Sequence, residues 1–143
     1  TVLYCEMEDE QRKIYDAYRN EYRSKILGTI EEQGIGSSQL TILQGLMKLR
    51  QICDSPSILN ETEKLPNASI KLDELARELQ ENMGHHKALV FSQFLGMLGL
   101  IKEKLTELEI PFVYFDGSTS APDREKAVNE FQNNEEVRVF LIS

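Results

Sequence analysis

Apolar residues recur at intervals of three and four through the first half of the chain, which is the spacing of one face of a helix. The first such stripe predicts a long helix over residues 8–32. A second stripe predicts a helix that Ser37 or Ser38 caps and that ends near Cys53. A third predicts a helix over residues 70–83. The apolar positions of the first stripe are Ile14, Tyr15, Tyr18, Tyr22, Ile26 and Ile30.

The second half changes to short, continuous apolar runs, which are typical of strands covered on both faces of a parallel sheet. Helical spacing over residues 94–108 and 121–131 separates these runs, and Ser120 with Asp123 resembles a capping box. A weak alternation predicts one further strand at residues 1–6. Strand, helix, strand, helix, strand predicts a right-handed βαβαβ unit, so the fold class is α/β. The three runs are residues 88–91, 112–115 and 137–142.

Ligands meet a parallel sheet at the carboxyl ends of its strands. The sequence places Ser92 and Gln93 after the first strand and Gly117, Ser118 and Thr119 after the second. Both loops precede a helix N-terminus, where unpaired N–H groups can hold an anion. One interpretation is a site for a phosphate backbone. The other is turn formation and helix capping by the same residues.

Composition narrows the function classes. The chain has 143 residues, is 41% hydrophobic and 28% charged, and carries a net charge of −8. This acidity argues against strong nucleic-acid binding by the chain alone, because such binding depends on cations beside phosphates. Cys5 and Cys53 lack Cys-x-x-Cys partners and predict ordinary thiols. No apolar run reaches the roughly 18 residues of a membrane helix, so no membrane partner is expected.

Three blocks of the second half resemble the opening of the C-terminal helicase lobe of Swi/Snf-family DNA translocases. Upstream, Gln11 and Tyr15 resemble the family's Gln-x-x-x-Tyr helix. Residues 49–56 resemble its Leu-Arg-x-x-Cys-Asn-His-Pro segment, with Asp54-Ser55 as a departure that suggests a bacterial member. The three blocks are Lys-Ala-Leu-Val-Phe-Ser-Gln-Phe at 87–94, Phe-Val-Tyr-Phe-Asp-Gly-Ser-Thr-Ser at 112–120, and Val-Arg-Val-Phe-Leu-Ile-Ser at 137–143.

The resemblance implies an incomplete RecA-like (P-loop NTPase-type) parallel sheet with flanking helices, preceded by a helical segment. Residues 1–68 would join the two lobes, and residues 69–143 would be the N-terminal half of the second lobe, truncated at 143. Arg124 would be mainly structural, pairing with an acidic neighbour, with DNA contact as the minor alternative. The residues implied to contact the DNA backbone are Ser92, Gln93, Gly117, Ser118 and Thr119.

ATP chemistry is expected to lie outside this chain, so no catalytic residue is expected in it. It has no Gly-x-x-x-x-Gly-Lys-Ser/Thr loop, and the family's Arg-rich motif would follow Ser143. Asp73-Glu-Leu-Ala76 only mimics a metal-binding box, since it lies inside an amphipathic helix. His85 and His86 have no further ligand at metal-binding spacing. ATP and Mg²⁺ are therefore expected only in a full-length parent protein.

The expected partners are double-stranded DNA and the first RecA-like lobe of the parent. The resemblance implies a bacterial cytoplasmic, nucleoid-associated protein, or a nuclear one in a eukaryote. A truncated sheet would leave an open edge or apolar face, which predicts self-association. The alternative function is a non-enzymatic α/β protein-interaction module.

Overall fold

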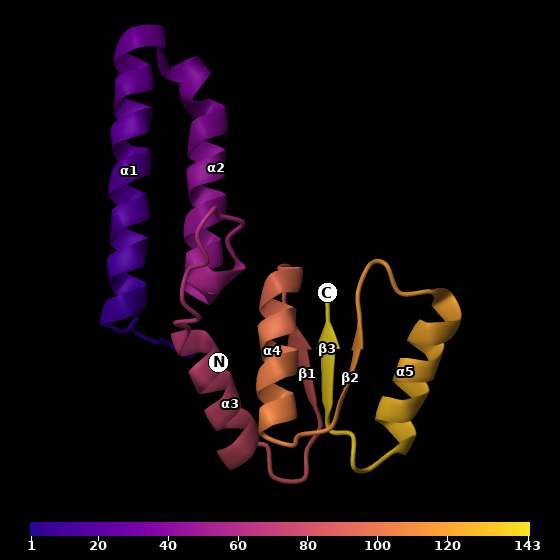
Figure 1. Cartoon of the computed structure of the whole chain (residues 1–143). Coiled ribbons are helices and arrows are strands. Elements are labelled where there is room, and N and C mark those ends of the chain that lie inside the picture. Colours follow the sequence, from indigo (N-terminus) through magenta and orange to yellow (C-terminus); the bar gives the residue numbers. More distant parts are fainter. The chain divides into compact units, whose positions relative to one another are not determined.

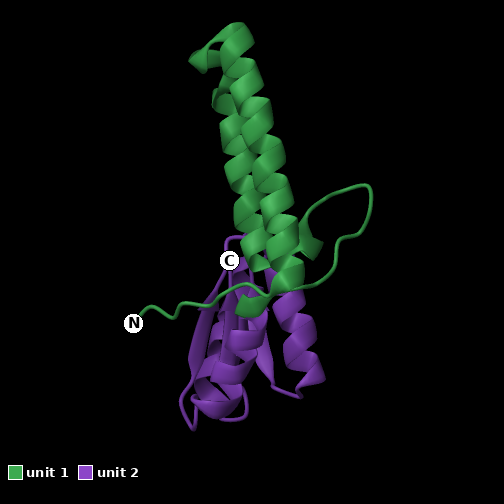
Figure 2. Cartoon of the chain, turned by 90° about the vertical axis from the view of Figure 1, so that its left-hand side faces the viewer, with its two compact units in different colours: residues 1–71 green, residues 72–143 purple.

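The computed structural model describes all residues, 1–143, and they form two compact units, residues 1–71 and 72–143 (Figure 2). The first unit is helical and the second contains the sheet. Helix α3, Ile70–Glu81, begins at the end of the first unit and continues in the second. None of the helices combines the length and apolar character needed to cross a membrane.

The first unit is a helical hairpin in which α1, Asp9–Gln33, and α2, Ile35–Asp54, lie side by side (Figure 1). The short 3-10 helix η1, Pro56–Ile58, follows. The predicted long first helix is confirmed, but the prediction of a strand at residues 1–6 is wrong, because those residues belong to no helix or strand. A strand needs a neighbouring strand for its backbone hydrogen bonds, and weak alternation alone does not supply one.

The predicted serine cap of the second helix is also wrong. Helix α2 begins at Ile35, with Gly34 at its N-cap in a left-handed conformation, φ 85°. Glycine adopts this conformation without a steric penalty, so the chain turns before it reaches the serines. The hydroxyls of Ser37 and Ser38 instead donate backwards, to the Gln33 and Ile35 carbonyls respectively.

A buried glutamine ties the open end of the hairpin together. The Gln11 side chain is 1% exposed. Its Nε2 donates to the Ile52 carbonyl at 2.9 Å and to the Cys53 carbonyl at 3.3 Å, and its Oε1 accepts from the Ile70 N–H at 3.1 Å. One side chain therefore joins the first turn of α1 to the last turn of α2 and the first residue of α3.

Close packing of the two hairpin helices depends on Gly45. A Cβ atom at this position would lie 2.8 Å from Cδ1 and 2.9 Å from Cγ of Tyr22. Those atoms sit at the root of the tyrosine side chain, where it cannot easily move aside. The glycine therefore allows α2 to approach the Tyr22 ring of α1.

Replacing Gly45 with alanine should lower the free energy of unfolding by about 1 kcal/mol. Overpacking costs about 1–3 kcal/mol, and the better helix propensity of alanine offsets about 1 kcal/mol of that. Gly28→Ala is the matched control, since nothing lies within 4 Å of a Cβ at Gly28 in α1. The control should gain up to about 1 kcal/mol in urea unfolding followed by circular dichroism. A Gly45→Ala variant as stable as Gly28→Ala would contradict the packing argument.

The second unit is a three-stranded parallel sheet with the order β1-β3-β2. Strand β1 is Ala88–Phe91, β2 is Phe112–Phe115 and β3 is Val139–Ile142. Helix α4, Leu95–Glu107, joins β1 to β2, and helix α5, Ala121–Asn133, joins β2 to β3 (Figure 1). The predicted order of elements and parallel sheet are confirmed, although the third strand begins two residues later than predicted.

The two connecting helices cover opposite faces of the sheet. Val113 and Phe140 form one buried cluster with Ala127 of α5. Residues of a strand alternate between faces, so Tyr114 and its partner in the sheet, Leu141, lie on the other side. Lys102 of α4 lies there, 3.9 Å from the centroid of the Tyr114 ring. The sheet is thus the middle layer of three.

Strand β1 departs from the prediction of a strand covered on both faces. Leu89 is 55% exposed and Phe91 is 68% exposed. In the sheet they are partners of Phe140 and Ile142 and so lie on the α5 face. Helix α5 packs on β2 and β3 and leaves this edge of its face open. A continuous apolar run predicts burial, but it does not reveal whether a neighbouring element covers each face.

Candidate nucleic-acid interface

The carboxyl ends of the three strands lie side by side at one edge of the sheet. The Ser92 N–H donates to the Ile142 carbonyl at 3.1 Å, and the Ser143 N–H donates to the Phe115 carbonyl at 3.3 Å. These bonds extend the ladder one residue past each strand. Adjacent strands lie about 4.8 Å apart, so the loops that follow β1 and β2 start about 10 Å apart. The structure therefore brings the two predicted loops to the same edge.

The loop after β2 is a tight turn closed at both ends. The Thr119 N–H donates to the Asp116 carbonyl at 3.2 Å, and the Asp116 N–H donates to Thr119 Oγ1 at 3.0 Å. Ser120 then caps α5 by accepting from the Asp123 N–H at 3.3 Å, as the capping-box pattern predicts. Turn formation and capping, the second of the two interpretations of these residues, are thus present in the structure.

Arg124 holds this loop from the first turn of α5. Its Nε donates to the Thr119 carbonyl at 3.0 Å, and its Nη2 donates to the Asp116 and Gly117 carbonyls at 3.0 and 3.3 Å. The guanidinium carbon also lies 5.3 Å from the centroid of the Phe115 ring. The expectation that Arg124 pairs with an acidic neighbour is therefore wrong: it binds three backbone carbonyls, since the loop folds back over its fork of donors.

The carboxylate of Asp116 accepts three hydrogen bonds from Ser118 and Tyr114. Its Oδ1 accepts from the Ser118 hydroxyl at 2.6 Å and from the Ser118 N–H at 2.8 Å, and its Oδ2 accepts from the Tyr114 hydroxyl. The hydrogen bonds from the Ser118 hydroxyl and then from Tyr114 hold the pKa of Asp116 at about 2, below its usual range. The hydrogen bond between Tyr114 and Asp116 also raises the pKa of Tyr114 to about 12. Asp116 is therefore an anion at neutral pH.

The loop after β1 is also internally bonded. Ser92 Oγ accepts from the Phe94 N–H at 3.2 Å, at the residue that precedes α4. Gln93 is exposed in this turn. The loop presents polar groups at the sheet edge without a cation of its own.

The structure places the five predicted contact residues at one edge. Their hydrogen-bond donors differ in whether they already have a partner within the chain. Both Ser118 donors bind Asp116, and the Thr119 N–H closes the turn. The Gly117 N–H makes no hydrogen bond within the chain, and a Cβ at Gly117 would meet nothing within 4 Å. Gly117 therefore marks the side from which a ligand can approach this loop.

Sequence reasoning did not single out Asp116 and Tyr114, whose hydrogen bonds organise this loop. Two signals were present: residues two apart on a strand share a face, and an aspartate two residues before a serine is a common Asx turn. The first places the Tyr114 hydroxyl beside the Asp116 carboxylate. The second closes Ser118 onto the same carboxylate.

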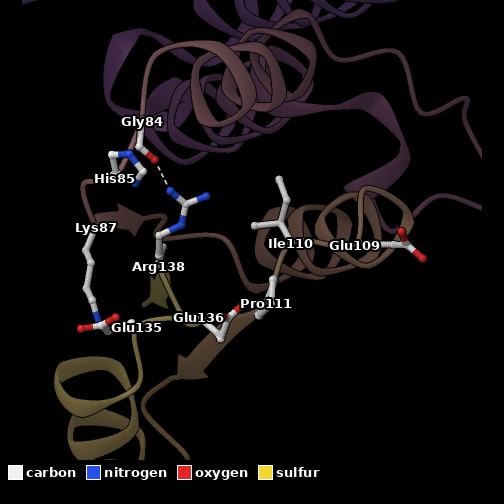
Figure 3. Close-up of a pocket in the computed structure, with 9 residues that line it drawn as sticks. All are labelled: Gly84, His85, Lys87, Glu109, Ile110, Pro111, Glu135, Glu136 and Arg138. Carbon is white, nitrogen blue, oxygen red and sulfur yellow. Dashed lines mark hydrogen bonds between the residues drawn. The ribbon is translucent and has the colours of Figure 1, made fainter.

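A cavity of about 900 Å³ lies at the opposite edge of the sheet, where the strands begin (Figure 3). Its two long basic side chains serve the fold. Lys87 donates to the carbonyls of Phe131 and Asn134 at the end of α5, and Arg138 donates to the Gly84 carbonyl after α3. The acidic side chains that line it are Glu109, Glu135 and Glu136. No group of three or more His, Cys, Asp or Glu side chains in the chain could hold a metal ion.

A family model matches the second unit together with the end of the first. The model, described as the helicase conserved C-terminal domain, matches residues 70–143. Among curated proteins, the DNA excision repair protein CSB of Oryza sativa subsp. japonica is 28% identical, and the match covers 99% of this chain. The chain spans only 12% of the length of that relative.

Two solved structures from Sulfolobus solfataricus share the fold across the whole chain. The SWI2/SNF2 ATPase C-terminal domain matches with a TM-score of 0.85 and 28% identity, covering 100% of this chain and 62% of that one. The SWI2/SNF2 ATPase core in complex with dsDNA matches with a TM-score of 0.80 and 27% identity, covering 100% of this chain and 30% of that one.

Proposed function

Since this chain belongs to the helicase conserved C-terminal domain family, within the SWI2/SNF2 ATPases, we propose that it supplies part of the DNA-backbone surface of the second motor lobe of an ATP-dependent DNA translocase. The observation that carries the proposal is the edge at which Ser92, Gln93 and the loop of Gly117, Ser118 and Thr119 lie together. A related core has been solved with dsDNA. ATP and Mg²⁺ would act in the complete protein.

The chemistry of this edge suits a phosphate better than a base. Its polar groups are hydroxyls and backbone N–H groups beside the N-termini of α4 and α5. Such groups position a nucleic-acid backbone and carry no sequence information. The nearby cations, Lys102 and Arg124, are engaged by the Tyr114 ring and by loop carbonyls. We therefore propose weak, sequence-independent contact, with most of the affinity supplied by the rest of the motor.

The Gly117→Asp variant should weaken DNA binding at this edge by about tenfold, because the added carboxylate repels a phosphate at close range. The variant avoids a steric clash, since nothing lies within 4 Å of a Cβ there. The measurement is fluorescence anisotropy of a labelled DNA duplex with the protein that carries both lobes, together with its DNA-stimulated ATP hydrolysis.

Two controls make this test specific. Gly117→Ala changes the backbone freedom in the same way without a charge and should leave affinity within about twofold of the parent value, as for other surface substitutions. Gly36→Asp adds the same charge in α2, also in open space. Equal affinities for Gly117→Asp and Gly117→Ala would refute the proposed surface and return the α/β protein-interaction module as the better function.

A further inference from the structure

The donors of Ser118 already bind an anion that belongs to the protein. Asp116 Oδ1 lies 2.8 Å from the Ser118 nitrogen and 2.6 Å from its hydroxyl oxygen. Hydrogen bonds from N–H and O–H groups to a charged oxygen are stronger than those to a neutral acceptor. A nucleic-acid phosphate that used the same donors would have to displace this carboxylate.

We infer that Asp116 is a positioning residue that competes with a nucleic-acid phosphate for the Ser118 donors, so that DNA binds this loop by exchange of one anion for another. The inference rests on the proposed function. It adds a residue that opposes binding to the residues that support it. Asp116 acts in two ways, by occupying the donors and by placing a negative charge next to the incoming phosphate.

Tyr114 provides an anchor for the displaced carboxylate. Its hydroxyl donates to the other carboxylate oxygen, Oδ2. Lys102 of α4 lies over the Tyr114 ring and places a positive charge near the carboxylate. When a phosphate takes the Ser118 donors, the Asp116 carboxylate turns away from Ser118, while its Oδ2 keeps the Tyr114 bond and Lys102 still partly neutralises it. The exchange therefore requires a side-chain rotation of Asp116 and no movement of the Ser118 backbone or of β2.

The exchange leaves the loop scaffold intact. Arg124 donates to the carbonyls of Asp116, Gly117 and Thr119, and none of these bonds uses the Asp116 carboxylate. The low pKa of Asp116, about 2, keeps the carboxylate charged at neutral pH, so a change of pH in the neutral range does not release Ser118. Release must come from a competing anion.

The Asp116→Asn variant should bind DNA about three- to tenfold more tightly, since an amide oxygen accepts the Ser118 bonds more weakly and carries no charge. Binding would be measured as for Gly117→Asp, with a labelled duplex and the protein that carries both lobes, and the chain of 143 residues would be used for the spectra. Amide NMR spectra supply a second readout: the Ser118 amide proton should move upfield in the variant, while the other amides keep their dispersion and show that the loop is folded.

Asp123→Asn is the matched control for net charge. Asp123 lies in the first turn of α5 and also accepts from a serine hydroxyl, that of Ser120 at 2.6 Å. Its affinity change should stay within about twofold, in the range of other surface substitutions. If Asp123→Asn tightened DNA binding as much as Asp116→Asn, the change in net charge alone would explain both effects. That result would overturn the inference.

The remaining outcomes separate the inference from the proposed function. If Gly117→Asp weakens binding while Asp116→Asn weakens it or leaves it unchanged, the surface stands and the competition does not. If neither substitution alters binding, the proposed surface itself fails. If Gly117→Asp weakens binding, Asp116→Asn tightens it and Asp123→Asn leaves it unchanged, both stand.

Discussion

Replacing Gln11 with leucine should lower the free energy of unfolding by about 3 kcal/mol, because leaving a buried polar group without a partner costs about 1–3 kcal/mol. Leucine preserves the apolar volume but removes all three hydrogen bonds of the amide. The Ile70 N–H and the Ile52 carbonyl would then lose the partner that joins them across the hairpin. Urea unfolding followed by far-ultraviolet circular dichroism, which reports mainly on the helices, measures the loss.

Two companion variants test whether the amide itself matters. Gln39→Leu makes the same change on the exposed surface of α2 and should cost less than about 0.5 kcal/mol. Gln11→Glu places a carboxylate oxygen against the Ile52 and Cys53 carbonyls, where it cannot donate. Repulsion and burial would raise the pKa of that carboxyl, so the variant should regain stability as the pH falls through the raised value and the acid becomes a donor. If Gln11→Leu lowered the free energy of unfolding by less than about 1 kcal/mol, the Gln11 amide would not be what stabilises the contact between α1, α2 and α3.

Replacing Arg124 with alanine should lower stability by about 2 kcal/mol and weaken duplex binding about tenfold, because hydrogen bonds from a charged donor contribute about 1.5–3 kcal/mol. Three loop carbonyls lose their donor, and the Gly117 and Ser118 backbone is no longer held at the sheet edge. Thermal unfolding and anisotropy with a labelled duplex measure the two effects. Hydrogen exchange should show faster exchange of the Thr119 amide, whose bond closes the turn.

The lysine variant tests whether Arg124 acts by binding the loop carbonyls or only by its positive charge. Arg124→Lys keeps the charge, but an ammonium cannot reproduce the planar fork that reaches three carbonyls. It should therefore recover less than half of the lost affinity. Full recovery would show that Arg124 acts as a charge toward DNA, the minor alternative. Lys126→Ala removes the same charge from the exposed surface of α5 and should have little effect on stability.

Local patterns predicted most of the secondary structure. Helical spacing and the apolar runs indicated the five α-helices and the three strands in their observed order, but not the short 3-10 helix η1, and the parallel sheet followed from short helical connections. The errors occurred where local signals competed. Gly34 ended the first helix before Ser37 could cap the next, and a continuous run at β1 concealed the open positions of Leu89 and Phe91.

The candidate site was predictable in place and only partly in chemistry. The rule that parallel strands present their carboxyl ends together located Ser92 and Gly117 at one edge. It could not show that Arg124 would bind carbonyls or that both Ser118 donors would bind Asp116. Each of those side chains had several possible partners, and the path of the loop selected one.

The order of the α-helices and strands, the parallel sheet and the edge that carries the hydroxyl-rich loops could all be read from local patterns, because these features depend on spacing within short segments. The bonds from Gln11 to Ile52 and Ile70, which lie 41 and 59 positions away, became apparent in the folded chain alone. The fold also sets which face of β1 is open and which loop donors are already bonded. Such choices depend on where the chain returns in space, and no local periodicity carries that information.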